Sequence, residues 1–172
     1  AEEFGERWYG ECLRHGIEPE THIDVIGDGA AWIRTVQRKI FPGSRYTLDM
    51  YHLQHAALEV LTERQYRYFC SLVWSRQRQE ALHYVKRLLP SDPEHSQELG
   101  SFCAYIERNI DGMFYNRLGP VGSGVVEKAA DIVVARRMKR RGMTRSREEG
   151  NNLLALRLPA LNDSYDRRCY AS

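Results

Sequence analysis

Two short apolar runs, each closed by an Asp, flank one amphipathic stretch near the start of the chain. The runs "HIDVIGDG" and "SRYTLDMYH" have the pattern of buried strands, and "AAWIRTVQRKI" between them has helical spacing. A further amphipathic segment, "EEFGERWYGECLRHG", precedes the first run and ends at a glycine, as helices often do. The order helix, strand, helix, strand favours an α/β arrangement in which parallel strands are covered by helices.

The strand pattern stops after this part of the chain. From Leu53 to Asn109 the spacing predicts two long helical stretches, at 53–89 and 94–110, broken by "PSDPEH". We therefore expect a large all-helical insertion and a chain that is predominantly helical. Five aromatic residues of this region are expected to pack between helices rather than to stack on nucleic-acid bases: Tyr66, Tyr68, Phe69, Trp74 and Tyr84.

Two further helices are predicted in the last third of the chain. In "GSGVVEKAADIVVARRMKRR" Ser123 can cap a helix that Gly142 stops, and this register puts Glu127 in the first turn. A shorter helix, "EEGNNLLALRL", is predicted to end at Pro159, and residues 159–172 have the composition of a tail.

Composition excludes several classes of protein. With 172 residues, 42% of them hydrophobic, the chain can bury a core, and it has no apolar run of the roughly 18 residues that a membrane span needs. The cysteines lack the paired spacing of a zinc module: Cys12, Cys70, Cys103 and Cys169. Its acidic, amphipathic start is unlike a signal peptide, so we expect a soluble cytoplasmic protein.

The candidate chemical groups are carboxylates from separate segments. Asp28 lies between two glycines where the first strand ends, Asp49 and His52 lie at the end of the next, and Glu127 opens a late helix. Ligands gather at the carboxyl ends of parallel strands. Carboxylates that converge there could hold two Mg²⁺ ions roughly 3.5–4 Å apart, the arrangement used for phosphoryl transfer.

Each of these residues also has a purely structural interpretation. Asp28 could bond to its own backbone in a turn, and Glu127 could complement the positive end of its helix. Asp49 could cap a helix while His52 packs in the core. His55 adds a second imidazole, but without a third ligand a histidine metal site is not expected.

A run of basic residues follows Glu127 on the same predicted helix. No acid lies between Asp131 and Glu148, and the run contains seven cations: Arg136, Arg137, Lys139, Arg140, Arg141, Arg145 and Arg147. A solvated helix face is one interpretation. Close to Glu127 we favour DNA phosphates as the partner, and such contacts position a duplex without reading its sequence.

Four segments in this order carry a resemblance to a known family: "VIGDGAAWI", "FPGSRYTLDMYH", "GPVGSGVVEKAADIVVARRMKRRGM" and "LLALR". The chain resembles the DDE-type transposases of bacterial insertion sequences, in particular the group related to Mutator-like elements. The resemblance covers roughly residues 2–158 and is most specific where "GSGVVE" is followed by "RMKRRGM". It implies an RNase H-like core with an all-helical insertion before the catalytic Glu and a C/DxxH signature after the second Asp.

Transferred residue by residue, the resemblance makes Asp28 the second Asp of the catalytic triad and Glu127 its Glu, both as metal ligands. Asp49 and His52 become the C/DxxH pair. The family's first Asp lies on strands that come before the helix with which this sequence opens, so we expect a partial catalytic core that has no strand-transfer activity alone. A rival assignment takes Asp28, Asp49 and Glu127 as the whole triad.

The implied organisation is a partial RNase H-like core at 1–52, a helical insertion at 53–118, core helices at 119–158 and a tail at 159–172. The implied cofactors are two Mg²⁺ or Mn²⁺ ions. The implied partners are the DNA of element ends and targets, with further copies of the chain in a transpososome on the bacterial nucleoid and no membrane.

Two positions depart from the family pattern, and two alternative functions stay open. Lys128 stands where a small residue is more usual, and Arg145 stands where a Trp is common. A Lys beside Glu127 would compete for its carboxylate if it pointed inward. The alternatives are a non-catalytic DNA-binding or interaction protein derived from a transposase, and an RNase H-like nuclease.

Overall fold

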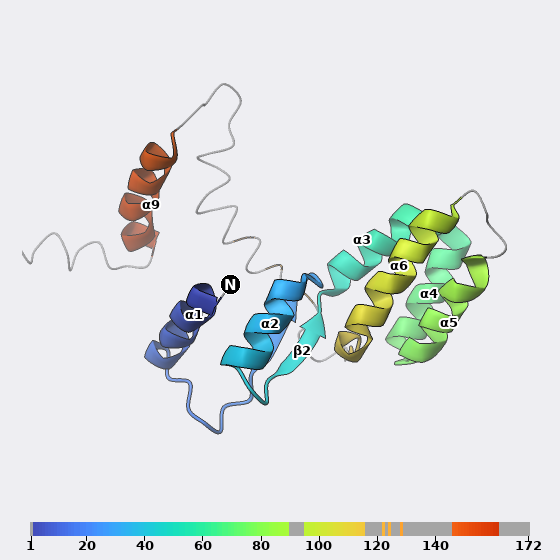
Figure 1. Cartoon of the computed structure of the whole chain (residues 1–172), viewed down its shortest axis with the longest axis horizontal. Helices are drawn as coiled ribbons and strands as arrows, with labels where there is room; N and C mark the ends of the chain where they lie inside the picture. Colours follow the sequence, from blue (N-terminus) through green and yellow to red (C-terminus); the bar gives the residue numbers. More distant parts are fainter. Residues whose placement is uncertain are drawn as a thin grey trace, which may run out of the picture. The chain divides into compact units, whose positions relative to one another are not determined.

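The computed structural model describes residues 2–89, 95–115, 122, 124, 128 and 146–161 (Figure 1). The chain divides into two compact units, Ala1–Gly122 and Ser123–Ser172. The structure is mostly helical with a small parallel sheet, which confirms the expected mixture of a short α/β part and many helices.

The first unit contains a strand–helix–strand motif. Strand β1 (Asp24–Gly27) pairs in parallel with β2 (Arg45–Leu48), and helix α2 (Ala31–Ile40) connects them. Parallel strands need such a crossover because the chain must return to the end of the sheet at which the first strand begins. In the observed register Gly27 lies opposite Leu48, so the two strands end together.

Helix α1 (Glu2–Arg14) packs against α2 through a glycine. A Cβ atom at Gly5 would lie 2.7 Å from Cγ1 of Ile40, so this close approach requires the absence of a side chain. Around this contact Trp8 meets Phe41 edge-on, with ring centroids 5.0 Å apart. Trp32, which the helical spacing predicts to point inward, is instead 48% exposed at the rim of the contact.

Four helices and a 3-10 turn follow the sheet and lie side by side (Figure 1). They are α3 (Met50–Val60), α4 (Glu63–Trp74), α5 (Arg78–Leu88), α6 (Ser96–Asn109) and η2 (Ile110–Gly112). The sequence predicts one long helical stretch where α3, α4 and α5 are found. Thr62 separates the first two by forming a capping box with Gln65, and Arg76, with φ 63°, separates α4 from α5.

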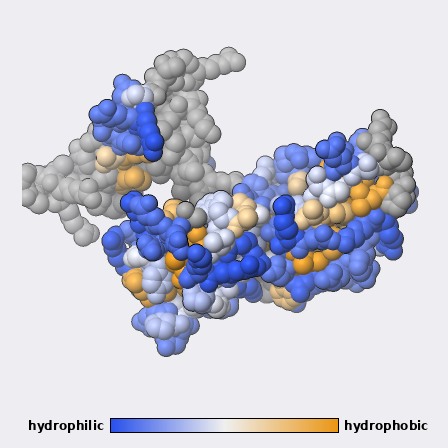
Figure 2. All heavy atoms as spheres, in the orientation of Figure 1, coloured by the Kyte–Doolittle hydropathy of each residue, from blue (hydrophilic) through white to orange (hydrophobic). Residues whose placement is uncertain are grey.

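The sheet and the helices share one hydrophobic core. Leu48 of β2, Leu53 of α3, Phe69 of α4 and Ile106 of α6 are all fully buried in it. Phe69 and Phe102 meet edge-on with ring centroids 5.5 Å apart. On the face in view, Figure 2 shows apolar residues only as narrow strips between hydrophilic ones.

The second strand is shorter than the sequence predicts, and His52 does not lie at its end. Strand β2 stops at Leu48, and Asp49 is the N-cap of α3, its carboxylate accepting a hydrogen bond of 2.8 Å from the backbone N–H of Tyr51. Because this cap starts a helix directly, His52 lies in the first turn of α3.

The described part of the second unit contains helix α9 (Arg147–Leu161). Ser146 and Glu149 cap its start reciprocally, with Oε2 of Glu149 2.8 Å from the backbone N of Ser146. The helix continues through Pro159, where the sequence predicts its end. Among the residues that the structure describes, no helix is both long and apolar enough to cross a membrane.

Candidate functional site

The carboxyl edge of the sheet places Asp28 and Asp49 next to each other. Each follows one member of the register pair formed by Gly27 and Leu48, and the backbone N–H of Asp49 donates to the carbonyl of Gly27 at 2.8 Å. Neighbouring strands run about 4.8 Å apart. The two backbones are therefore adjacent, as the sequence predicts for parallel strands.

Asp28 is exposed and belongs to a tight turn. Its Oδ1 atom accepts a hydrogen bond of 2.9 Å from the backbone N–H of Ala30, which confirms the turn interpretation of this residue. Gly29, with φ +94°, makes the turn possible. The turn fixes the direction of the carboxylate and leaves the group at the surface of the protein.

Asp49 is only 1% exposed, so its environment differs from that of Asp28. Its capping of α3 confirms the structural interpretation of this residue. His52, for which core packing is one interpretation of the sequence, is only partly buried, and its ring meets Tyr51 edge-on with centroids 5.6 Å apart. At the carboxyl edge of the sheet, Asp49 therefore lies beneath the surface and Asp28 lies on it.

Two tyrosines that the sequence analysis did not single out hold the turn after β1. The hydroxyl of Tyr46 accepts from the backbone N–H of Gly29 at 3.1 Å and donates to the carbonyl of Gly27 at 3.2 Å. From α6, the hydroxyl of Tyr105 donates to the carbonyl of Asp28 at 2.9 Å. A Cβ atom at Gly29 would lie 2.7 Å from Cε2 of Tyr105, so the fit requires glycine.

A third tyrosine, Tyr115, lies deeper. It is 1% exposed, and its hydroxyl has no hydrogen-bond partner within the described residues. Burial raises its pKa, and the neighbouring Tyr105 and Asp49 raise it further. Burial is also the main cause of the raised pKa of Tyr105, to which Tyr46, Asp28 and Asp49 add. Both carboxylates of the edge therefore act on the same tyrosine.

Because these tyrosines are buried, we expect the free energy of unfolding to fall at alkaline pH. Burial raises the pKa values of Tyr46, Tyr105 and Tyr115 in the folded protein, whereas unfolded tyrosine ionises near pH 10. The unfolded chain then binds fewer protons, so between about pH 10 and its own raised pKa each tyrosine should lower the free energy of unfolding by up to about 1.4 kcal/mol per pH unit. Urea unfolding at several pH values, with absorbance at alkaline pH to count unionised tyrosines, measures this. Equal stability at neutral and strongly alkaline pH would contradict it.

The segment that leads toward Glu127 reaches this edge at Gly122. A Cβ atom at Gly122 would lie 3.4 Å from Oδ1 of Asp49, so the backbone at Gly122 lies directly beside that carboxylate. Glu127 follows five positions later in the sequence. Its place, and with it the predicted approach of Glu127 to Asp28, lies outside the described residues.

The oxygen donors at this edge are of the kind that Mg²⁺ prefers. Asp28 offers an exposed carboxylate, and Asp49 adds a second carboxylate beneath the surface. Within the described residues, no group of three or more His, Cys, Asp or Glu side chains is arranged to hold a metal ion. The described edge therefore supplies oxygen donors of a suitable kind but not a complete set of metal ligands.

The basic run lies mostly outside the described residues. Of its seven cations only Arg147 is described, and it is exposed at the start of α9. Lys128, which departs from the family pattern, is exposed as well. The place of Arg145, the second departure, lies outside the described residues.

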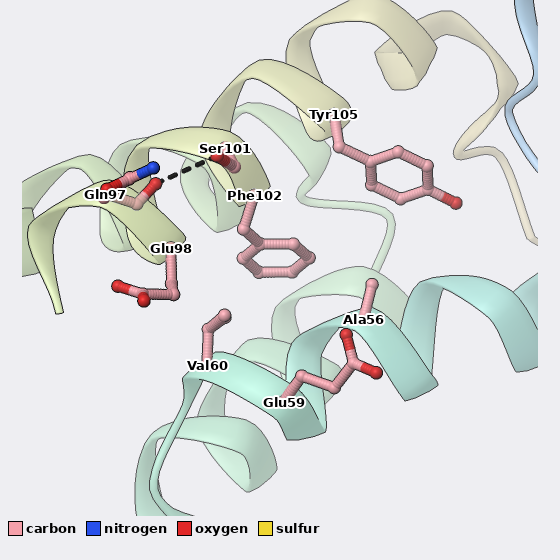
Figure 3. A pocket seen from close by; sticks show the side chains of 8 residues that line it. All are labelled: Ala56, Glu59, Val60, Gln97, Glu98, Ser101, Phe102 and Tyr105. Carbon is pink, nitrogen blue, oxygen red and sulfur yellow. Dashed lines mark hydrogen bonds between the residues drawn. The ribbon is translucent and has the colours of Figure 1, made fainter.

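Helix α6 borders two cavities of different character. One, of about 390 Å³, lies between α3 and α6 and carries the carboxylates of Glu59 and Glu98 on opposite helices (Figure 3). The other, of about 500 Å³, lies between α2 and the end of α6 and is lined by Arg34, Arg38 and Arg108. The lining of this basic cavity includes Gly29, the residue after Asp28.

Comparison with known proteins finds no match for this chain, whether among protein-family models, curated proteins or solved structures.

Proposed function

We propose that this chain is part of the catalytic domain of a DDE-type transposase with an RNase H-like core, and that it takes part in metal-dependent cleavage and joining of DNA. The observation that carries the proposal is the edge where two parallel strands end in adjacent aspartates, one of them exposed. Ligands of open α/β sheets bind at such edges. The sequence resemblance supplies the type of reaction.

In this proposal Asp28 and Glu127 are the metal ligands on this chain. The turn that fixes Asp28 directs its carboxylate, and Gly122, five positions before Glu127 in the sequence, lies against Asp49 at the same edge. In a completed site Asp28 and Glu127 would help to hold two Mg²⁺ ions, which would supply activation of the attacking oxygen and stabilisation of the leaving oxygen. The basic run from Arg136 to Arg147 would hold DNA by its phosphates.

The structure favours Asp49 as a positioning residue over Asp49 as a metal ligand. Its carboxylate is buried and caps α3, so it stabilises the junction of strand and helix on which the edge is built. This role fits the assignment of Asp49 and His52 to the C/DxxH signature better than the rival triad of Asp28, Asp49 and Glu127.

One observation favours a second candidate, a transposase-derived protein that binds DNA without cutting it. The hydrogen bonds of Asp28 and Asp49 to neighbouring backbone N–H groups give both residues a structural role that needs no metal. A protein that has lost catalysis would keep such roles. The two candidates differ in their effect on DNA.

Nicking of supercoiled plasmid in Mg²⁺ or Mn²⁺ separates them. A catalytic chain should nick in the presence of the metal, and Glu127→Gln should lower the rate by about 100-fold or more, because even the loss of an outer-shell partner costs about 10–100-fold. The matched control is Glu149→Gln, which changes an exposed Glu at the start of α9. DNA binding without any nicking would assign the non-catalytic role.

A further inference from the structure

We propose that the basic cavity between α2 and α6 binds a backbone phosphate of DNA next to Asp28. The proposal takes DNA as the partner from the proposed function, and it assigns to that partner a second contact region apart from the basic run. The cavity is lined by Gly29, Ala30, Ala31, Arg34, Thr35, Arg38, Arg108 and Asn109. It is the charge and shape of this lining that point to a phosphate.

One of the three guanidinium groups is fixed in place. Arg34 forms an ion pair with Asp111, and its guanidinium carbon lies 4.3 Å from the centre of the Tyr46 ring. The side chain of Arg34 is only 13% exposed, so it costs little further ordering when a ligand binds. Tyr46 in turn bonds to Gly27 and Gly29, which ties this arginine to the turn that carries Asp28.

The other two guanidinium groups are available to a ligand. Arg38 and Arg108 are exposed, and within the described residues neither has a carboxylate at ion-pair distance. The charge of Arg38 also acts on Asp111. Desolvation raises the pKa of Asp111, but the hydrogen bond and charge of Arg34, together with the charge of Arg38, lower it further, so that the net effect is a lowered pKa. Arg34 and Arg38 thus act on the one carboxylate of Asp111, and with Arg108 in the lining the cavity keeps an excess of positive charge.

The backbone at the mouth of the cavity adds to this preference. Ala30 is the N-cap of the ten-residue helix α2, has no capping side chain, and is followed by a first turn without acidic residues. The start of a helix attracts anions through its dipole and its free N–H groups. Because Ala30 and Ala31 have small side chains, an anion can come close to this backbone.

The lining favours a polynucleotide backbone over a free nucleotide. It contains no aromatic or large apolar side chain on which a base could stack, and only glycine, alanine, threonine, asparagine and arginine residues contribute to it. Arg38 and Arg108 are open to solvent, where a duplex with one charge per roughly 1.7 Å can reach them. The other cavity of α6, with Glu59 and Glu98, would repel the same ligand.

The test measures DNA binding by the whole chain in EDTA. The signal is the fluorescence anisotropy of a short fluorescein-labelled duplex, recorded over a range of NaCl concentrations. The variant Arg38→Gln/Arg108→Gln removes two phosphate contacts and leaves Arg34 in its structural place. We expect weaker binding, and a plot of log affinity against log salt that is shallower by about 1.8, from about 0.9 per contact. The control, Arg7→Gln/Arg14→Gln, removes the same charge from α1, where each arginine pairs with a nearby Glu.

An unchanged slope in the cavity variant, or an equal change in the α1 control, would overturn the proposal. So would a variant that loses binding of inorganic phosphate by calorimetry but keeps its DNA affinity, because the cavity would then serve a free anion. Circular dichroism checks that both variants fold. Since EDTA excludes metal chemistry, a changed slope together with absent nicking would leave this inference intact and count against catalysis by this chain alone.

Discussion

Replacing Asp28 with Asn should weaken Mn²⁺ binding by about 100-fold or more if Asp28 is the direct ligand proposed above, because the substitution removes its charge and even outer-shell losses cost about 10–100-fold. Mn²⁺ titration followed by electron paramagnetic resonance measures the affinity. The Asn side chain keeps an oxygen that can accept the hydrogen bond from Ala30, so the turn after β1 should persist. The loss would then report the missing charge and not a damaged fold.

The matched control for this variant lies on the same strand. Asp24→Asn removes a carboxylate at the opposite end of β1, where Asp24 pairs with Arg45 at 2.6 Å. Asp24 is partly buried and accepts two hydrogen bonds from Arg45, so its replacement should lower stability but leave metal binding unchanged. If Asp28→Asn and Asp24→Asn bind Mn²⁺ equally well, Asp28 is a turn residue and the assignment of the carboxyl edge as a metal site is wrong.

The sequence was sufficient to predict the strand–helix–strand motif because its elements are strongly patterned. The apolar runs around Val25 and Tyr46, and the helical spacing between them, each occur where the structure has β1, β2 and α2. The ends of elements were predicted less well. Asp49 could end a strand or cap a helix, and only the bond to Tyr51 decides between these in favour of the cap.

The aspartates of the site could be predicted, but their surroundings could not. Asp28 and Asp49 follow apolar runs of parallel strands, so local pattern alone brings them to one edge. Tyr105 and Arg108 reach this edge from α6, and no local pattern links residues so far apart in the chain. Arg34 and Arg38 did carry a signal, since residues four apart share one face of a helix.

Replacing Phe69 with Ala should cost about 3–5 kcal/mol of unfolding free energy, the usual effect of deleting a buried aromatic side chain. Phe69 is fully buried in α4 and contacts Phe102 of α6. Since α6 also carries Tyr105, a loosened contact between α4 and α6 should reach the turn of Asp28 as well.

Urea unfolding followed by circular dichroism measures the loss caused by Phe69→Ala. The control is Leu58→Ala, because Leu58 is 55% exposed and its removal should change stability by no more than about 0.5 kcal/mol. If the packing of the helices does not affect the carboxyl edge of the sheet, Phe69→Ala should leave the affinity for Mn²⁺ unchanged at urea concentrations where the protein is still folded. If instead the shared core positions α6 against β1, metal affinity and stability should fall together, and the geometry of the aspartate edge then depends on helices α3, α4, α5 and α6.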